Sequence, residues 1–333
     1  MTLPDDYQRI RQHAALATVA PRGLLVLSGR DRGTYLQGLL TNDTASLKPG
    51  TGCYAAWLTA NGRMTTDLHV LESGDTILLD VPAAETAGVA ARLDQFIFTE
   101  DVQVADVSAE LRRLEVHGPE AAGVIAAALG HPAALEELGG WPAYRNARVQ
   151  AGALTVVVAR IDQLGVPGFV LYVSAGDAAV LGGLLESAGA APVAPEAVEA
   201  VRIEAGWPVY GVDMNSEIIP LEAGIESRAI SMTKGCYVGQ EIIVRVLHRG
   251  HGRVAKRLVG LRIDGSEPVS AGEKLDAGSH EAGWVTSSAQ SPALGTIALG
   301  YLHRDQAKPG TSVTTASGRA AVVSELPMNS AAQ

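Results

Sequence analysis

The pattern of apolar and turn-forming residues changes at about residue 252, and this change limits the available folds more than any other feature. Beyond it, short runs rich in Val, Leu and Ile are separated by Gly, Pro and Ser, with almost no helical period. Short strands at such spacing are typical of a small antiparallel β-barrel. The predicted strands are Ala255–Ile263, Glu281–Ser288, Thr296–Leu302, Ser312–Thr315 and Ala320–Leu326.

Before this point, predicted helices alternate with strands that short turns connect. Asn61-Gly62 lies between two alternating apolar runs and is a strong hairpin signal. No series of strand–helix–strand units appears, so an α+β class fits better than a doubly wound sheet. The predicted strands are 24–27, 54–58, 65–71, 76–81, 154–160 and 169–173, and the predicted helices are 6–20, 31–40, 83–95, 119–129, 177–188 and 195–206.

The length of the chain predicts more than one domain. A chain of 333 residues exceeds what one hydrophobic core usually supports. We therefore predict an α+β region over residues 1–251 and a small β-barrel over residues 252–330.

The formal net charge of −10 argues against a broad nucleic-acid-binding surface, which needs Lys and Arg to replace phosphate counterions. One basic strip nevertheless occurs, and it is compatible with either a solvated loop or an anion-binding edge. Its members are Arg245, His248, Arg249, His251, Arg253, Lys256 and Arg257.

The compartment is predicted from what the chain lacks. The first residues form no signal peptide, and no apolar run is long enough to span a bilayer. Two unpatterned cysteines, Cys53 and Cys236, make no disulfide framework. We expect a cytoplasmic monomer without membrane contact.

Several reactive side chains lie close to two glycines in the string Lys234-Gly235-Cys236-Tyr237-Val238-Gly239-Gln240-Glu241. A lysine near a cysteine favours the thiolate, the nucleophilic form. In an extended segment, residues two apart share a face, so Lys234 and Cys236 would point the same way. We expect a loop or strand end here and a helix that begins near Gly239, although Ile242-Ile243-Val244 is also compatible with a strand.

Each of these residues is also compatible with a purely structural role. Lys234 could be a surface lysine, and Tyr237 could be a packing residue. Gln240 and Glu241 are compatible with helix N-terminal groups. Arg245 lies one turn after Glu241 and could pair with it. Because Cys236, His248 and His251 have irregular spacing for a metal site, we predict no bound metal.

Several further stretches agree with one family. They are Leu36-Gln37-Gly38-Leu39-Leu40-Thr41-Asn42-Asp43, Lys48-Pro49-Gly50, Asn61-Gly62-Arg63, Arg202-Ile203-Glu204-Ala205-Gly206, Ile219-Pro220-Leu221-Glu222 and Gly283-Trp284-Val285-Thr286-Ser287-Ser288. Together with the string at 234–241, they resemble the folate-binding family that includes the glycine-cleavage T-protein and YgfZ. The resemblance runs from about residue 22 to residue 327.

The resemblance implies two α+β subdomains around a central folate channel, followed by the barrel, with tetrahydrofolate as cofactor near the string. The string itself is similar to the YgfZ branch. It implies a folate-binding accessory factor that assembles or repairs iron–sulfur proteins, with iron–sulfur clients or assembly proteins as partners. Cys236 and Lys234 would carry the chemistry. The implied folate contacts are Asp67, Glu204, Tyr210, Tyr237, Gln240 and Arg245.

Two departures from the T-protein pattern bear on the alternative function, a tetrahydrofolate-dependent aminomethyl transferase. Thr66-Asp67 stands where T-proteins carry adjacent acids, which leaves one carboxylate. Val170 stands where they carry an acid for the pterin. A third alternative is an interaction scaffold that uses the basic strip to bind an acidic partner.

Overall fold

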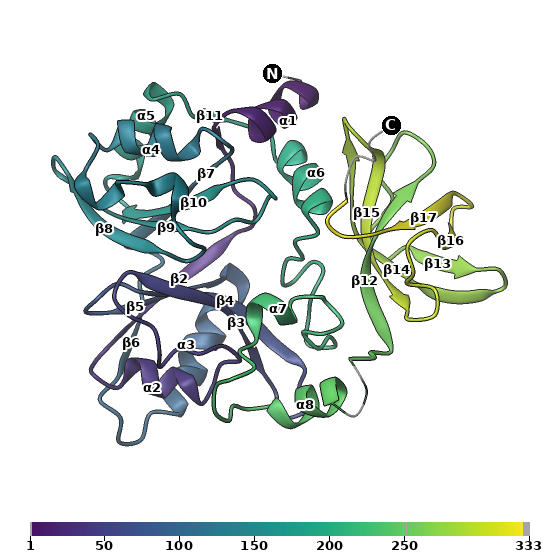
Figure 1. Ribbon diagram of the computed structural model, residues 1–333, viewed down its shortest axis with the longest axis horizontal. Helices are drawn as coiled ribbons and strands as arrows, with labels where there is room; N and C mark the ends of the chain where they lie inside the picture. Colours follow the sequence, from purple (N-terminus) through teal and green to yellow (C-terminus); the bar gives the residue numbers. More distant parts are fainter. Residues whose placement is uncertain (1, 249, 251, 329–333) are drawn as a thin grey trace.

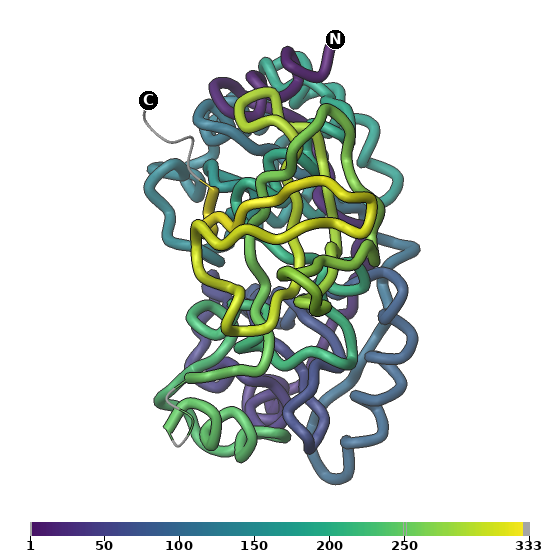
Figure 2. Tube along the Cα trace, turned by 90° about the vertical axis from the view of Figure 1, so that its right-hand side faces the viewer, coloured from purple at the N-terminus to yellow at the C-terminus, as the bar shows by residue number. Residues whose placement is uncertain are grey.

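Two β-sheets with helices on their outer faces make up the larger part of the molecule, and a β-barrel stands beside them (Figure 1). The computed structural model describes residues 2–248, 250 and 252–328. Turned by 90°, the barrel lies in front of the two-sheet body (Figure 2).

The first sheet has five antiparallel strands in the order β3-β4-β5-β2-β6. Helices α2 and α3 cover its outer face, where Leu36 and Leu93 join a buried core with Leu68. The elements are β2 (Arg22–Ser28), α2 (Arg32–Gln37), β3 (Thr51–Leu58), β4 (Met64–Glu72), β5 (Ile77–Pro82), a 3-10 turn (Ala83–Glu85), α3 (Thr86–Gln95) and β6 (Gln103–Asp106).

The second sheet has six strands in the order β11-β1-β7-β10-β9-β8. Helices α4 and α5 cover its outer face through Ile125 and Leu181. The elements are β1 (Ala15–Leu16), β7 (Leu111–His117), α4 (Ala121–Ala128), two 3-10 turns (Ala133–Leu135, Leu138–Gly140), β8 (Asn146–Ala151), β9 (Leu154–Arg160), β10 (Gly168–Ser174), α5 (Ala178–Ser187) and β11 (Ala191–Pro192).

The inner faces of the two sheets pack against each other. Leu24 and Leu71 of the first sheet share a buried cluster with Val170 and Tyr172 of the second. Strand β10 is therefore covered on both faces, which explains why six of its seven residues are buried.

Helix α6 (Pro195–Ala205) lies between the two-sheet body and the barrel. It packs against α1 (Leu3–Gln12) on one side and against the barrel strand β14 on the other. Helices α7 (Glu226–Ala229) and α8 (Gln240–His248) follow. The barrel closes in the order β12-β15-β14-β13-β16-β17. Its strands are β12 (Lys256–Ile263), β13 (Lys274–Ala277), β14 (His280–Ser291), β15 (Gly295–His303), β16 (Ser312–Thr315) and β17 (Ala320–Ser324).

Most predicted elements occur, with shifted ends. The Asn61-Gly62 hairpin is confirmed between β3 and β4, and Gly62 has a φ of +72°. The helix after Gly239 is also confirmed, so the strand alternative for residues 242–244 is wrong.

The prediction of a helix over residues 6–20 is wrong at both ends. Helix α1 covers only Leu3–Gln12, because Ala15–Leu16 pairs with β7 and β11 instead of continuing the helix. The prediction also missed the strands β1, β6, β7, β8, β11 and β13, which are short or polar.

Candidate functional site

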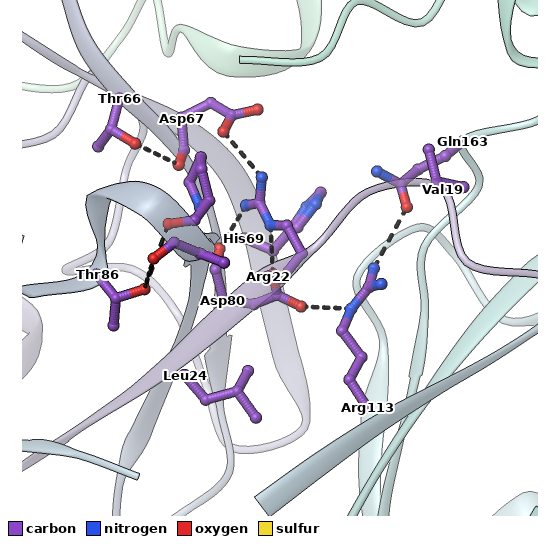
Figure 3. Close-up of polar contacts among 12 residues, drawn as sticks. Val19, Arg22, Leu24, Thr66, Asp67, His69, Asp80, Thr86, Arg113 and Gln163 are labelled. Carbon is purple, nitrogen blue, oxygen red and sulfur yellow. Dashed lines mark hydrogen bonds and ion pairs between the residues drawn. The ribbon is translucent and has the colours of Figure 1, made fainter. Parts of the chain in front are cut away.

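A polar cluster lies buried where the inner faces of the two sheets meet (Figure 3). Its carboxylates and guanidiniums come from β2, β4, β5 and β7. Beside it is a small cavity of about 10 Å³, room for one water molecule. The cavity is lined by Ala20, Arg22, Asp67, Arg113, Gln163, Trp207, Pro208 and Val209.

Asp67 is the carboxylate of this cavity and is 3% exposed. The hairpin at Gly62 sets the register of β4, so alternate residues of the strand point to the inner face. The Asp67 carboxylate accepts hydrogen bonds from Arg22 Nη1 at 3.0 Å and from the Tyr54 hydroxyl at 2.6 Å. The neighbouring Thr66 donates its hydroxyl to the Asp67 carbonyl. Asp67 is therefore held in place from two sides.

Asp80 of β5 connects the two sheets. It accepts from Arg22 Nε at 2.6 Å, from Arg113 Nε at 2.8 Å and from the Tyr172 hydroxyl at 2.7 Å. Burial by itself would raise the pKa of Asp80, but the guanidiniums of Arg113 and Arg22 hold that pKa well below its usual value. Asp80 thus fixes both arginines across the sheet interface.

Strand β7 continues the cluster into the second sheet. Arg113 pairs with Glu115, and Glu115 lies 3.1 Å from His117 Nε2. Burial opposes the charge of Glu115, yet Arg113 lowers the pKa of this carboxyl below its ordinary value. Arg113 Nη2 also reaches Gln163 at 3.4 Å. The result is one chain of contacts from His117 to Asp67.

His69, two residues after Asp67, is fully buried between aromatic rings. Its Nδ1 lies 3.3 Å from the Tyr144 hydroxyl, and the rings of Tyr54 and Tyr144 lie 5.3 and 5.8 Å from its own. Burial, reinforced by the charge of Arg22, lowers the pKa of His69 to about 4. The imidazole is therefore neutral at pH 7.

Two open clefts adjoin the cavity. One, of about 290 Å³, shares Ala20 and Val209 with the cavity and is walled by Pro21, Pro82 and Tyr210. The other, of about 230 Å³, lies on the side of Arg22 and Arg113. A flat, partly polar ligand could lie in the first cleft with one end toward Asp67.

The predicted folate contacts do not all lie here. Asp67 lines the cavity and Tyr210 lines the first cleft. Glu204 of α6 is 2% exposed and accepts from the Tyr7 hydroxyl at 3.0 Å, as well as from Arg11 and Ser291. The side chain of Glu204 thus holds α1, α6 and β14 together.

The motif residues lie beside α2 instead. Lys234 Nζ donates to the carbonyls of Gln37, Leu40 and Asn42 at 2.6, 2.5 and 3.1 Å. Burial lowers the pKa of Lys234 to about 8. Cys236 is exposed. In the described part of the chain, no hydrogen bond, ion pair or ring contact joins Lys234 or Cys236 to Asp67.

The remaining motif residues are placed as follows. Tyr237 is buried in the core beneath α8, with Lys234 Nζ 5.1 Å from its ring. Gln240 begins α8, and Arg245 is exposed near its end. Of the basic strip, Arg249 and His251 lie outside the described residues. Within those residues, no group of three His, Cys, Asp or Glu side chains could hold a metal ion.

Sequence reasoning did not single out Arg22, Asp80, Arg113 or Glu115. One signal was present, because Arg113, Glu115 and His117 alternate at period two and so share one face of a strand.

Among the described residues, no helix is long and apolar enough to cross a membrane.

Comparison with known proteins finds two family models that match this chain. A family model described as the GCVT N-terminal domain matches residues 2–234, and one described as the glycine cleavage T-protein C-terminal barrel domain matches residues 256–328. An aminomethyltransferase of Rubrobacter xylanophilus is 31% identical over 298 residues, which cover 89% of this chain and 78% of that protein. An aminomethyltransferase of Geobacillus kaustophilus is 31% identical over 318 residues, which cover 94% of this chain and 85% of that protein.

A solved structure supports the fold. The crystal structure of glycine cleavage system aminomethyltransferase T from Bartonella henselae matches with a TM-score of 0.86 at 24% identity. The match covers 98% of this chain and 90% of that one. The predicted α+β body with an antiparallel C-terminal barrel is therefore confirmed.

The relatives also correct the predicted function. They are named aminomethyltransferase at about 30% identity, which favours the alternative. The prediction of an accessory factor for iron–sulfur proteins, based on the string at 234–241, is therefore wrong. Since family models match both parts of the chain in order, this chain belongs to the glycine cleavage T-protein family.

Proposed function

We propose that this protein is a tetrahydrofolate-dependent aminomethyl transferase that works at Asp67. The observation that carries the proposal is the position of Asp67, a buried carboxylate in a small cavity that adjoins an open cleft, in a chain whose relatives are named aminomethyltransferase. The proposal uses only the broad family. The narrower YgfZ-type resemblance rests on the string at 234–241 and takes no part in it.

The cleft residues suit a reduced pterin. The walls at Pro21, Pro82 and Tyr210 offer an apolar surface to a flat ring. Asp67 offers carboxylate oxygens to the N–H groups of a ring edge. Because the space beside Asp67 holds only one water, we expect the ligand to displace side chains there, Trp207 among them.

The bonds and protons of the proposed transfer balance as follows. The bonds from the aminomethyl carbon to the donor atom and to its own nitrogen break, the nitrogen leaves as ammonia, and the carbon becomes the methylene bridge of methylene-tetrahydrofolate. Tetrahydrofolate supplies the two nitrogens that bind the carbon, and their two protons go to the donor and to the departing ammonia.

This chain's own groups orient the reactants. Asp67 would accept a hydrogen bond from a reacting N–H and stabilise positive charge that develops on nitrogen. Arg22 and Tyr54 fix the direction of that carboxylate. His69 is neutral at pH 7 and so adds no opposing positive charge.

Two measurements test the proposal. Tetrahydrofolate titration should change the fluorescence of Trp207, and Trp207→Phe should lose that signal. With an aminomethyl donor, the wild type should form methylene-tetrahydrofolate and ammonium in equal amounts. Asp67→Asn should lower the rate by about 100-fold or more.

The control is Asp75→Asn, since Asp75 is an exposed carboxylate paired with Arg148. Its rate should equal that of the wild type. Failure of the wild type to turn over any aminomethyl donor, or full activity of Asp67→Asn, would contradict the proposal.

A further inference from the structure

A groove on the rim of the barrel is lined by basic side chains. Its volume is about 340 Å³. Four of its eight lining residues are cations and none is acidic. The eight lining residues are Gly252, Arg253, Val254, Arg257, Arg304, Ala307, Lys308 and Pro309.

The barrel fixes the positions of these cations. Arg253 precedes β12 and Arg257 lies at its start, and Arg304 and Lys308 follow the end of β15. The two segments are joined by the hydrogen bond from the Arg304 amide to the Ala255 carbonyl at 3.0 Å. The pairing of β12 with β15 ends at Lys256 and His303, so the segments that flank this end of the ladder bring the four side chains together.

Little negative charge neutralises this groove. Arg304 lies 3.6 Å from the exposed carboxylate of Asp305. Among the described residues, Arg253, Arg257 and Lys308 have no ion pair. Like charges held close together repel one another, and a bound anion would remove that repulsion. The feature is notable in a chain of net charge −10, whose overall field repels anions.

The groove continues toward the centre of the molecule. A second cleft, of about 430 Å³, shares Arg257, Ala307 and Pro309 with it and also includes Arg228. Arg228 lies 4.1 Å above the Trp207 ring, and its buried Nε and Nη2 have no hydrogen-bond partner among the residues that the structure describes. The second cleft also contains Glu226 and Glu325, so its lining is mixed in charge.

We propose that the rim groove binds a small, flexible anion that carries several negative charges along its length. Guanidinium groups bind carboxylate and phosphate alike through paired N–H donors, so both chemistries suit Arg253 and Arg257. Four cations and no carboxylate among the eight lining residues favour an anion with several charges over a singly charged ion. This site does not depend on the transfer reaction at Asp67, and either can fail without the other.

Isothermal titration calorimetry with two probes tests the groove. Tri-γ-glutamate represents a carboxylate chain and tripolyphosphate represents a phosphate chain. We expect saturable binding of at least one probe to the wild type, with affinity that falls as salt is raised. The variant Arg257→Gln/Lys308→Gln should bind that probe at least tenfold more weakly. The probe that binds more tightly identifies the chemistry.

The matched control is Arg30→Gln/Lys48→Gln, which removes the same charge from exposed positions outside the groove. It should bind as the wild type does. Circular dichroism and thermal melting confirm that both variants are folded. The proposal is overturned if neither probe binds the wild type below millimolar concentration, or if the groove variant binds as tightly as the control.

Discussion

At the scale of single residues, Lys234 and Cys236 show how neighbours in sequence enter different environments. An ammonium group has three N–H donors, and Lys234 directs them at three carbonyls at the end of α2 and in the segment after it. Cys236, two positions later, is exposed to solvent. Lys234 thus attaches the motif to the first sheet. We expect that replacing its side chain will mainly lower the stability of the fold.

Lys234→Met should lower the free energy of unfolding by about 2 kcal/mol, because three carbonyls lose a charged donor. Cys236→Ser should change it by less than about 0.5 kcal/mol, since the side chain is exposed. Urea denaturation measures both. Equal stability of Lys234→Met and the wild type would show that the three hydrogen bonds contribute nothing.

His69 should make stability depend on pH. Its pKa in the fold is about 4, below the 6.5 of a free histidine. Between these values the unfolded chain binds more protons than the folded one, so stability falls as pH drops from 6.5 to 4. The slope should reach about 1.4 kcal/mol per pH unit.

His69→Phe keeps an aromatic ring between Tyr54 and Tyr144 but cannot titrate. Denaturation at several pH values should show a shallower slope for this variant between pH 6.5 and 4. His13→Phe, the same substitution at an exposed position, is the matched control for replacing a histidine by phenylalanine. An unchanged slope in His69→Phe would assign the acid sensitivity to other groups.

At the scale of elements, strand β7 contributes more to the contact between the two sheets than its composition suggests. Its sequence is largely charged, yet Glu115 and His117 are buried because the strand lies between β1 and β10 in the second sheet. Arg113 of this strand pairs with Asp80 of the first sheet. The two sheets are therefore joined by a buried ion pair as well as by apolar packing.

Arg113→Met should reduce the free energy of unfolding by about 3–5 kcal/mol, because it leaves Glu115 and Asp80 short of a buried partner. The comparison variant is Arg148→Met, which removes an exposed ion pair between β8 and Asp75 and should cost less than about 1 kcal/mol. Chemical denaturation distinguishes them. Similar losses in both variants would contradict the role given to the buried pair.

At the scale of the whole molecule, buried polar groups attach the barrel to the body. Arg202 of α6 pairs with Asp213 at 2.7 Å and donates to Ser287 of β14 at 3.0 Å. Asp213 also accepts from Thr286 and Ser287 at 2.5 and 2.8 Å. We expect the barrel and the body to unfold together because of this attachment.

Asp213→Asn should weaken that coupling, since Arg202 is 1% exposed and would lose its buried carboxylate. Differential scanning calorimetry should show a lower and broader transition than in the wild type. Glu281→Gln, which breaks an exposed pair on the barrel, should leave the transition unchanged. A sharp wild-type transition in Asp213→Asn would show that apolar packing alone couples the two parts.

Local patterns predicted much of this architecture. The Asn61-Gly62 turn and the short strands after residue 252 were predicted because their signals lie within a few residues of each other. Strand β7 was missed because its charged face is buried against Asp80 of the opposite sheet, a contact that no local pattern shows. Among the site residues, Asp67 came from a family resemblance, whereas Arg22 and Asp80 carry no local signal.

The sequence by itself determined the α+β class, the C-terminal barrel and the family, since each depends on local spacing or on motifs. Only the tertiary structure decided what those residues contact. It placed Lys234 on backbone carbonyls, enclosed Asp67 between Arg22 and Tyr54, and gathered Arg253, Arg257 and Lys308 into one groove. The physical reason is that charge interactions act through space, between groups that lie far apart along the chain.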